Sequence, residues 1–206
     1  MDSKVLSIIF YNIAVLLFAG CEPERISIEG PPINAHYIVE PDTDIVKVGD
    51  TVYISLEIPA HFLLNNGDSQ FIFDGDFDLP ISMKKYDISE PGSVWSLPSL
   101  QDCHTFSVYG YFSKNKNGTG VTGINTLLTN GVYLFKMGII PLKQNLFWFT
   151  VTRDGYFHSG KLNTYVYSDF AGVNRNHHLI DTIPGMQGWL STDEANEGTF
   201  AFQVTD

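Results

Sequence analysis

The stretch FDGDFDL places three carboxylates at alternate positions, as Asp74, Asp76 and Asp78. Alternate residues of a β-strand share one face, where successive carboxylates would lie about 6.5–7 Å apart. Carboxylate oxygens are ligands that Ca²⁺ prefers, so the three aspartates are a candidate calcium site if a neighbouring loop adds oxygens. The stretch lacks the bidentate Glu that closes a calcium loop about twelve positions on. The favoured alternative is a solvated strand face with no cofactor, whose charges discourage pairing at a sheet edge.

Two tryptophans are candidates for ligand binding. Trp95 in GSVWSLP and Trp189 in GMQGWLS stand among Gly, Ser and Pro residues, as loop residues do. An indole ring in an exposed loop offers a broad apolar face with one polar N–H group, which suits a sugar ring. The alternative for each tryptophan is a lid over the end of the core. Trp148 in LFWFTV belongs to a run that is apolar on both faces, so we expect it in the core.

No catalytic residue is predicted. The segment from Gly155 to Lys161 has the spacing of a phosphate-binding loop, but Leu162 follows where a magnesium-binding hydroxyl is needed. The neighbours Cys103 and His104 cannot form a dyad on a strand, because adjacent side chains point to opposite faces. The chain contains neither a G-x-S-x-G elbow nor an H-E-x-x-H zinc motif. A hydrolase remains an alternative, since the carboxyl pairs of glycosidases come from distant strands.

The N-terminus is predicted to carry an export signal. The apolar run from Val5 to Phe18 is too short to cross a bilayer comfortably, since a spanning helix needs about 20 apolar residues. Its length and the small residues after it fit a signal peptide. The sequence Phe18-Ala19-Gly20-Cys21 resembles the lipobox of bacterial lipoproteins. That resemblance implies cleavage before Cys21 and acylation of this cysteine, which would anchor the mature chain in a membrane.

The chain is acidic, with 12 Lys and Arg residues, 23 Asp and Glu residues and a net charge of −11. Such a surface repels phosphate backbones, so we expect no nucleic-acid partner. It also disfavours adhesion to anionic lipids through basic residues, so the lipid on Cys21 would make the membrane contact. With Cys21 acylated, Cys103 has no cysteine left to pair with. The fold must therefore rest on its core, in which we expect Cys103 to be a small buried residue.

Short apolar runs alternate with turn sequences along the rest of the chain. Runs such as TFSVYGYF, GVYLFKMG and NLFWFTVT are rich in β-branched and aromatic residues, and NNGD, NKNGTG and RDG supply turns. Only DFAGVNRNHHLIDTI, near Leu179, suggests one or two helical turns. We predict an all-β chain folded as a two-layer sandwich. The expected divisions are a lipoprotein signal peptide (1–20), a flexible tether (21–35) and the β-sandwich domain (36–206).

Two segments carry a family resemblance. VKVGDTVYISLEI and the closing EGTFAFQVTD are similar to the first and last strands of immunoglobulin-like domains in Bacteroidetes-type cell-envelope lipoproteins. The resemblance implies an immunoglobulin-like β-sandwich displayed at the bacterial cell envelope. The Cys–Trp–Cys pattern of antibody domains is absent from the sequence.

These observations together predict a lipoprotein anchored in the bacterial cell envelope, on the periplasmic or the exposed side of the outer membrane. We expect a non-enzymatic binding or structural module, and its sharper form is a carbohydrate-binding module that uses Trp95 or Trp189. One alternative is an accessory subunit that docks onto another envelope protein. The other alternative is an envelope hydrolase.

Overall fold

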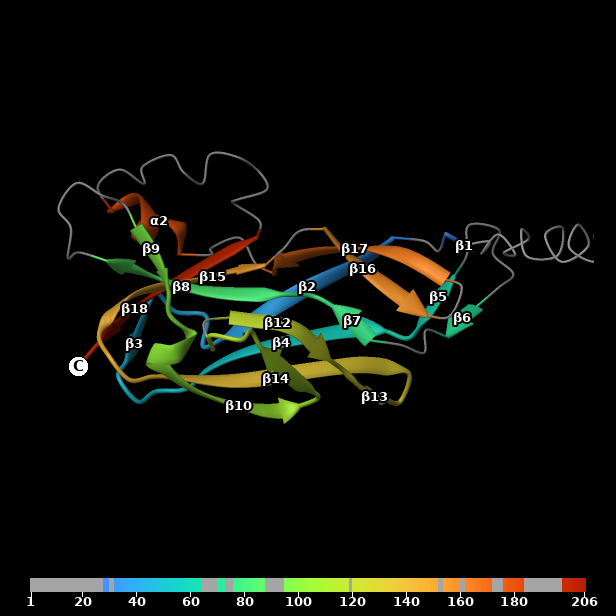
Figure 1. Cartoon of the computed structure of the whole chain (residues 1–206), viewed down its shortest axis with the longest axis horizontal. Helices are drawn as coiled ribbons and strands as arrows, with labels where there is room; N and C mark the ends of the chain where they lie inside the picture. Colours follow the sequence, from blue (N-terminus) through green and yellow to red (C-terminus); the bar gives the residue numbers. More distant parts are fainter. Residues whose placement is uncertain are drawn as a thin grey trace, which may run out of the picture.

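The chain folds as the all-β sandwich that the sequence predicts (Figure 1). The helical elements among the described residues are a single 3-10 turn, η1 (Leu100–Asp102), and a short helix, α2 (His177–Asp181). The computed structural model describes residues 28–29, 32–63, 70–72, 76–87, 95–118, 120–151, 154–159, 162–171, 176–183 and 198–206. Three predicted site residues, Cys21, Asp74 and Trp189, lie outside these ranges.

Eighteen strands are described. In the N-terminal half they are β1 (Ile28–Glu29), β2 (Ile33–Glu40), β3 (Ile45–Lys47), β4 (Val52–Pro59), β5 (His61–Leu63), β6 (Gln70–Ile72), β7 (Asp76–Asp78), β8 (Ile81–Asp87) and β9 (Trp95–Pro98). In the C-terminal half they are β10 (Cys103–Tyr109), β11 (Tyr111–Lys114), β12 (Gly120–Asn125), β13 (Leu127–Thr129), β14 (Val132–Pro141), β15 (Asn145–Val151), β16 (Asp154–Ser159), β17 (Leu162–Phe170) and β18 (Thr199–Thr205).

Twelve strands follow one another in a continuous hydrogen-bonded order, β10-β14-β4-β2-β17-β16-β7-β12-β8-β15-β18-β3, which turns back on itself to make the two layers. Four others, β1, β9, β11 and β13, pair with members of this order, and β5 and β6 pair with each other in a separate sheet. β2 pairs with β4 in one layer, whereas β3 pairs with the last strand, β18, in the other. The chain therefore crosses between the layers after Glu40, at a cis Glu40–Pro41 peptide bond. The pairings β2–β17 and β3–β18 are parallel, and most of the others are antiparallel.

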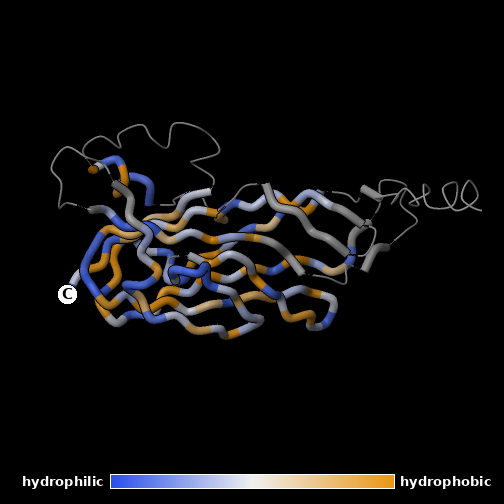
Figure 2. The backbone as a smooth tube through the Cα atoms, in the orientation of Figure 1, coloured by the Kyte–Doolittle hydropathy of each residue, from blue (hydrophilic) through white to orange (hydrophobic). Residues whose placement is uncertain are grey.

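The core lies between the two layers and is built by alternation along the strands. β2 is the plainest case, with alternating buried and exposed residues from Ile33 to Glu40. Successive side chains of a strand point to opposite faces, so one face of such a strand is apolar and packs in the core. Figure 2 shows that apolar residues recur along the strands of both layers. The largest fully buried side chains are Trp148, Tyr37, Phe135, Phe147, Phe149, Phe170 and Phe202.

The predicted boundary between tether and domain is wrong. β2 begins at Ile33 rather than at His36, and Ile33 and Ala35 are buried in the core. Further upstream, Ile28 and Glu29 pair in parallel with Leu162 and Asn163 of β17. The sequence INAHYIVE alternates apolar and polar residues, as a strand with one buried face does. The prolines that precede it favoured the interpretation as a tether.

The layer formed by β8, β15 and β18 is covered on its outer face as well as its inner face. Helix α2 packs there over a small apolar cluster that contains Leu146, Trp148 and Ile180. The side chain of His177 attaches the helix to the sheet, since its Nε2 atom lies 2.8 Å from the carbonyl oxygen of Thr199. Trp148 is fully buried, as predicted, and it lies beneath α2 rather than between the layers. Within the described parts of the chain, no helix is long and apolar enough to span a membrane.

Candidate functional site

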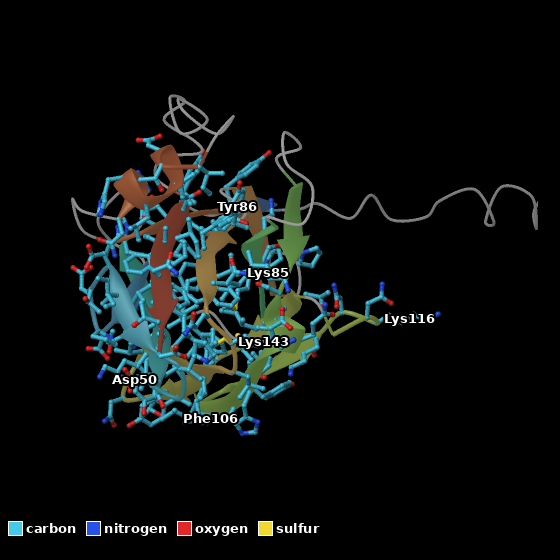
Figure 3. The ribbon with its side chains drawn as sticks, turned by 90° about the vertical axis from the view of Figure 1, so that its left-hand side faces the viewer. Asp50, Lys85, Tyr86, Phe106, Lys116 and Lys143 are labelled. Atoms are coloured by element: carbon cyan, nitrogen blue, oxygen red, sulfur yellow. The ribbon has the colours of Figure 1, made fainter. Side chains whose placement is uncertain are left out.

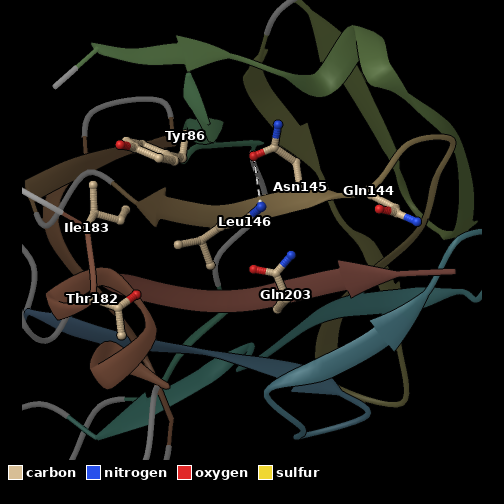
Figure 4. A pocket seen from close by; sticks show the side chains of 7 residues that line it. All are labelled: Tyr86, Gln144, Asn145, Leu146, Thr182, Ile183 and Gln203. Carbon is tan, nitrogen blue, oxygen red and sulfur yellow. Dashed lines mark hydrogen bonds between the residues drawn. The ribbon is translucent and has the colours of Figure 1, made fainter. Parts of the chain in front are cut away.

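A hollow of about 350 Å³ opens beside the end of α2, on the outer side of the layer formed by β8, β15 and β18 (Figure 4). Four parts of the chain meet there: the end of β8, the start of β15, the turn after α2 and β18. The residues that line it are Tyr86, Gln144, Asn145, Leu146, Thr182, Ile183 and Gln203. The hollow therefore combines one phenol ring with its hydroxyl group, three carboxamides, the Thr182 hydroxyl and two aliphatic side chains.

The apolar wall of the hollow belongs to the cluster under α2. Leu146 and Ile183 are both buried in that cluster, and Tyr86 packs against its edge while remaining partly exposed. The turn after α2 is held by a hydrogen bond from the Ile183 N–H group to the Ile180 carbonyl, 3.0 Å long. One side of the hollow is thus a fixed apolar surface continuous with the protein interior.

Three polar side chains of the hollow are hydrogen-bonded to the backbone. Asn145 Oδ1 accepts a hydrogen bond of 2.8 Å from the Leu146 N–H group, as the dashed line in Figure 4 marks. Gln203 Nε2 donates to the Val204 carbonyl at 3.1 Å. The Thr182 hydroxyl donates to the Leu179 carbonyl at 2.6 Å. Each of these side chains therefore presents a defined remaining donor or acceptor.

An ion-pair cluster contains the two lysines that directly precede lining residues in the sequence, Lys85 before Tyr86 and Lys143 before Gln144 (Figure 3). Asp102 lies 2.6 Å from the Lys85 ammonium group and 3.2 Å from that of Lys143. Its side chain is only 10% exposed. Burial by itself would raise the pKa of the Asp102 carboxyl group, but hydrogen bonds from the two ammonium groups outweigh it and hold this pKa below its ordinary value.

Among the predicted site residues that the structure describes, Trp95 lies on a strand that pairs with β8, the strand of Tyr86. It begins strand β9 instead of lying in a loop, and its backbone pairs with Asp87. The next pair in that register joins Ser96 to Tyr86, the aromatic residue of the hollow. The strand that carries Trp95 is therefore the direct neighbour of the strand that carries Tyr86.

The favoured interpretation of the sequence placed the acidic strand at a sheet edge. The structure places its described residues, Asp76 and Asp78, inside the sheet. β7, which contains Asp76 and Asp78, pairs with β16 on one side and with β12 on the other. Its backbone register joins Asp76 to His158 and Asp78 to Tyr156. In the part of the chain that the structure describes, no three His, Cys, Asp or Glu side chains gather as metal ligands would.

Cys103 is buried in the core, with its Sγ 3.8 Å from the Met83 sulfur. Burial, and to a lesser degree the charge of Asp102, raises the pKa of the Cys103 thiol to about 12. His104, its neighbour, is exposed on the other face of β10. The two residues do not form a dyad, and Cys103 lacks the thiolate character of a nucleophile.

Sequence reasoning named none of the residues that line the hollow, because they are separated by up to 117 positions and carry no motif. Tyr86 follows two lysines, and Gln144 and Asn145 precede an apolar run, which reads as an ordinary strand boundary. The single usable signal was the run LFWFTV, apolar on both faces. It indicates that something covers the outer face of β15, and the hollow lies where that cover ends.

A second, smaller hollow of about 200 Å³ lies on the outer face of the other layer. The residues that line it are Ile38, Glu40, Ser55, Leu56, Glu57, Tyr109, Leu134, Phe135 and Lys136. Lys136 forms an ion pair of 2.7 Å with Glu40 and places its ammonium group 4.7 Å from the centre of the Tyr53 ring. This hollow is charged where the first is neutral.

No protein-family model matches this chain, and neither does any curated protein sequence. Among solved structures, it is similar to the DNA-binding domain of Cep-1, the Caenorhabditis elegans orthologue of human p53, with 14% identity, a TM-score of 0.31 and coverage of 71% of this chain and 87% of the other. It is also similar to a type II cohesin domain from the cellulosome of Acetivibrio cellulolyticus, with 9% identity, a TM-score of 0.20 and coverage of 84% and 92%.

Proposed function

We propose that this protein is a non-enzymatic carbohydrate-binding module, anchored in the bacterial cell envelope through a lipid on Cys21. The observation that carries the proposal is the neutral hollow beside α2, in which the Tyr86 ring and three carboxamides surround an apolar wall. A sugar ring has hydroxyl groups around its rim and C–H groups on its faces, so it needs an aromatic or aliphatic surface together with amide and hydroxyl partners.

The size of the hollow suits such a ligand. Small-molecule sites of about 300–1,000 Å³ are usual, and a hollow of about 350 Å³ stands at the lower end of that range. This is room for one sugar ring of a longer chain. Glycoside hydrolysis requires a pair of carboxyl groups, and none of the described residues that line the hollow supplies one. Binding without hydrolysis is therefore the function we propose.

The proposal is tested by calorimetric titration of the mature chain with a panel of oligosaccharides. Cys21→Ser keeps the protein soluble and leaves every described residue unchanged. Tyr86→Leu should weaken binding about tenfold, because it removes the flat ring face and keeps an apolar contact. The matched control is Tyr167→Leu, which changes an exposed tyrosine on β17, away from the hollow. If no oligosaccharide binds, or if the two variants behave alike, the proposal is wrong.

A second candidate function, docking onto another envelope protein, is supported by an apolar corner at the end of the strand order. β10 and β13 both pair with the same side of β14, and β10 ends the order. Five large apolar side chains are each 43–60% exposed there: Val108, Tyr109, Tyr111, Leu127 and Leu128. Exposed apolar groups next to a strand edge are typical of protein interfaces.

Site-specific photocrosslinking in intact cells tests this second candidate. A photoreactive residue at Leu128 should capture one defined envelope protein, and the same residue at Tyr167 should not. Equal capture from both positions, or from neither, would rule out docking at this corner.

A further inference from the structure

We propose that the hollow beside α2 selects an uncharged sugar ring and rejects sugars that carry a carboxylate. This inference rests on the carbohydrate-binding function proposed above and names the class of ligand. It follows from three observations: the orientation of Asn145, the acceptor atoms of Gln203 and Thr182, and the ion pairs of Lys85 and Lys143 with Asp102.

Asn145 presents a donor to the hollow. Its Oδ1 atom accepts the Leu146 N–H group at 2.8 Å, which fixes the orientation of the carboxamide. The Nδ2 amino group has no partner among the described residues and is left to the ligand. An amide N–H group donates only, so it needs a hydroxyl or carbonyl oxygen opposite it.

Gln203 and Thr182 present acceptors. Gln203 uses one N–H of Nε2 to donate to the Val204 carbonyl, which leaves its Oε1 atom as an acceptor beside the second N–H. Thr182 donates its hydroxyl hydrogen to the Leu179 carbonyl at 2.6 Å, so only its lone pairs remain. A sugar hydroxyl satisfies both kinds of partner, because it donates and accepts, whereas a carboxylate only accepts.

The two lysines next to the hollow in sequence are already paired. Lys85 precedes Tyr86 and Lys143 precedes Gln144, and both ammonium groups contact the nearly buried carboxylate of Asp102. Moving either one to a ligand would leave part of that charge unpaired in a poorly solvated place. No described residue that lines the hollow is cationic, and the net charge of −11 repels anions.

A carboxylate placed opposite Gln203 Oε1 and the Thr182 hydroxyl oxygen would therefore meet lone pairs, and no lining residue among those described supplies a cation. We expect a uronic acid to bind at least about tenfold more weakly than the hexose of the same stereochemistry, because buried acceptors left unpaired are costly. The two sugars differ only at C6, so the comparison isolates the charge.

The experiment titrates the mature Cys21→Ser chain with methyl hexopyranosides and with the matching methyl glycosides of uronic acids, whose C6 carboxylate is free. Asn145→Asp replaces the donor by an acceptor of the same shape, and its Oδ1 still receives the Leu146 N–H group. This variant should lose at least about tenfold in affinity for the neutral sugar. Asn34→Asp adds the same charge on an exposed position of β2 and should bind as the parent chain does. Melting temperatures of both variants confirm that they fold.

The outcomes separate this inference from the function on which it rests. Uronates that bind as tightly as hexoses, or an Asn145→Asp variant that binds normally, would overturn the selectivity and leave carbohydrate binding in place. Binding of neither class would remove the proposed function, and this inference with it.

Discussion

At the scale of single residues, Cys103 and Asp102 lie next to each other in sequence and have opposite ionisation behaviour. The thiol of Cys103 faces the core, where an anion would be poorly solvated, and its pKa rises to about 12. The carboxyl group of Asp102 lies between two ammonium groups, and its pKa falls. The first residue is thereby kept neutral and the second kept charged at neutral pH.

Cys103 should be unreactive in the folded protein. Thiolate is the reacting species, and burial suppresses both its formation and its access to reagents. In the Cys21→Ser chain we expect a thiol reagent at pH 8 to label Cys103 more than about a hundredfold more slowly than in urea. Mass spectrometry against time measures both rates. Rapid labelling of the folded chain would show that β10 does not hold Cys103 inside.

Asp102 should contribute stability that depends on pH. Its pKa is lower in the folded chain than in the unfolded chain, so its contribution is complete well above pH 4 and is lost as pH falls through the folded value. Asp102→Asn should therefore destabilise the protein by about 2 kcal/mol at pH 7 and by progressively less below about pH 4. Urea unfolding at pH 7 and pH 3 measures the difference. An equal loss at both values would contradict the ion-pair account.

At the scale of elements, the short helix α2 forms one border of the hollow. It has five residues, and an isolated helix of that length is not stable in water. Its buried Ile180 and the apolar wall of Leu146 and Trp148 hold it against β15. The hollow exists because α2 covers only part of this outer face.

The start of β2 should be essential to the fold, contrary to the prediction of a tether. Ile33 is buried, so Ile33→Ala should lower the free energy of unfolding by about 2–5 kcal/mol. Asn34, the next residue, is exposed, and Asn34→Ala should change it by no more than about 0.5 kcal/mol. Chemical denaturation compares the two. If both variants unfold like the parent chain, residues 33–35 do not belong to the sandwich.

Periodicity predicted the elements well where one face is buried. The alternation in VKVGDTVYISLEI gave β4, and the doubly apolar LFWFTV gave a strand covered on both sides with Trp148 inside. Pairing partners could not be predicted in the same way. The interior position of β7 depends on contacts with β16 and β12, which lie about 50–80 residues further along the chain.

The site could be predicted even less, because it has no local pattern. A calcium ligand set or a nucleophile elbow has fixed spacing, but Tyr86, Asn145 and Gln203 meet only through the order β8-β15-β18. Sequence reasoning chose the tryptophans as the aromatic candidates. One of them, Trp95, lies on β9, the strand that pairs with the strand of Tyr86, but it does not belong to the residues that line the hollow.

At the scale of the whole molecule, the acidic sandwich and the proposed N-terminal lipid anchor would act separately. The proposed lipid on Cys21 holds the chain to the envelope, while the net charge of −11 keeps the domain from adhering to anionic lipid. The hollow and the apolar corner lie on different layers of the sandwich, so ligand binding and docking would not compete.

Acylation is tested by growing cells with radiolabelled palmitate. The parent protein should incorporate label and stay with membranes, and Cys21→Ala should do neither, since Cys21 is the only cysteine at the predicted cleavage point. Cys103→Ala is the matched control and should label normally. An unlabelled parent protein in the soluble fraction would rule out the lipid anchor.

The most direct test of carbohydrate binding in the hollow is chemical-shift mapping of the ¹⁵N-labelled Cys21→Ser chain during titration with a neutral methyl hexopyranoside. We predict that the largest backbone shifts occur at Tyr86, Leu146, Ile183 and Gln203, and that the side-chain NH₂ resonance of Asn145 moves with them. Shifts centred on the β10–β13 corner, or no shifts at millimolar sugar, would contradict this account.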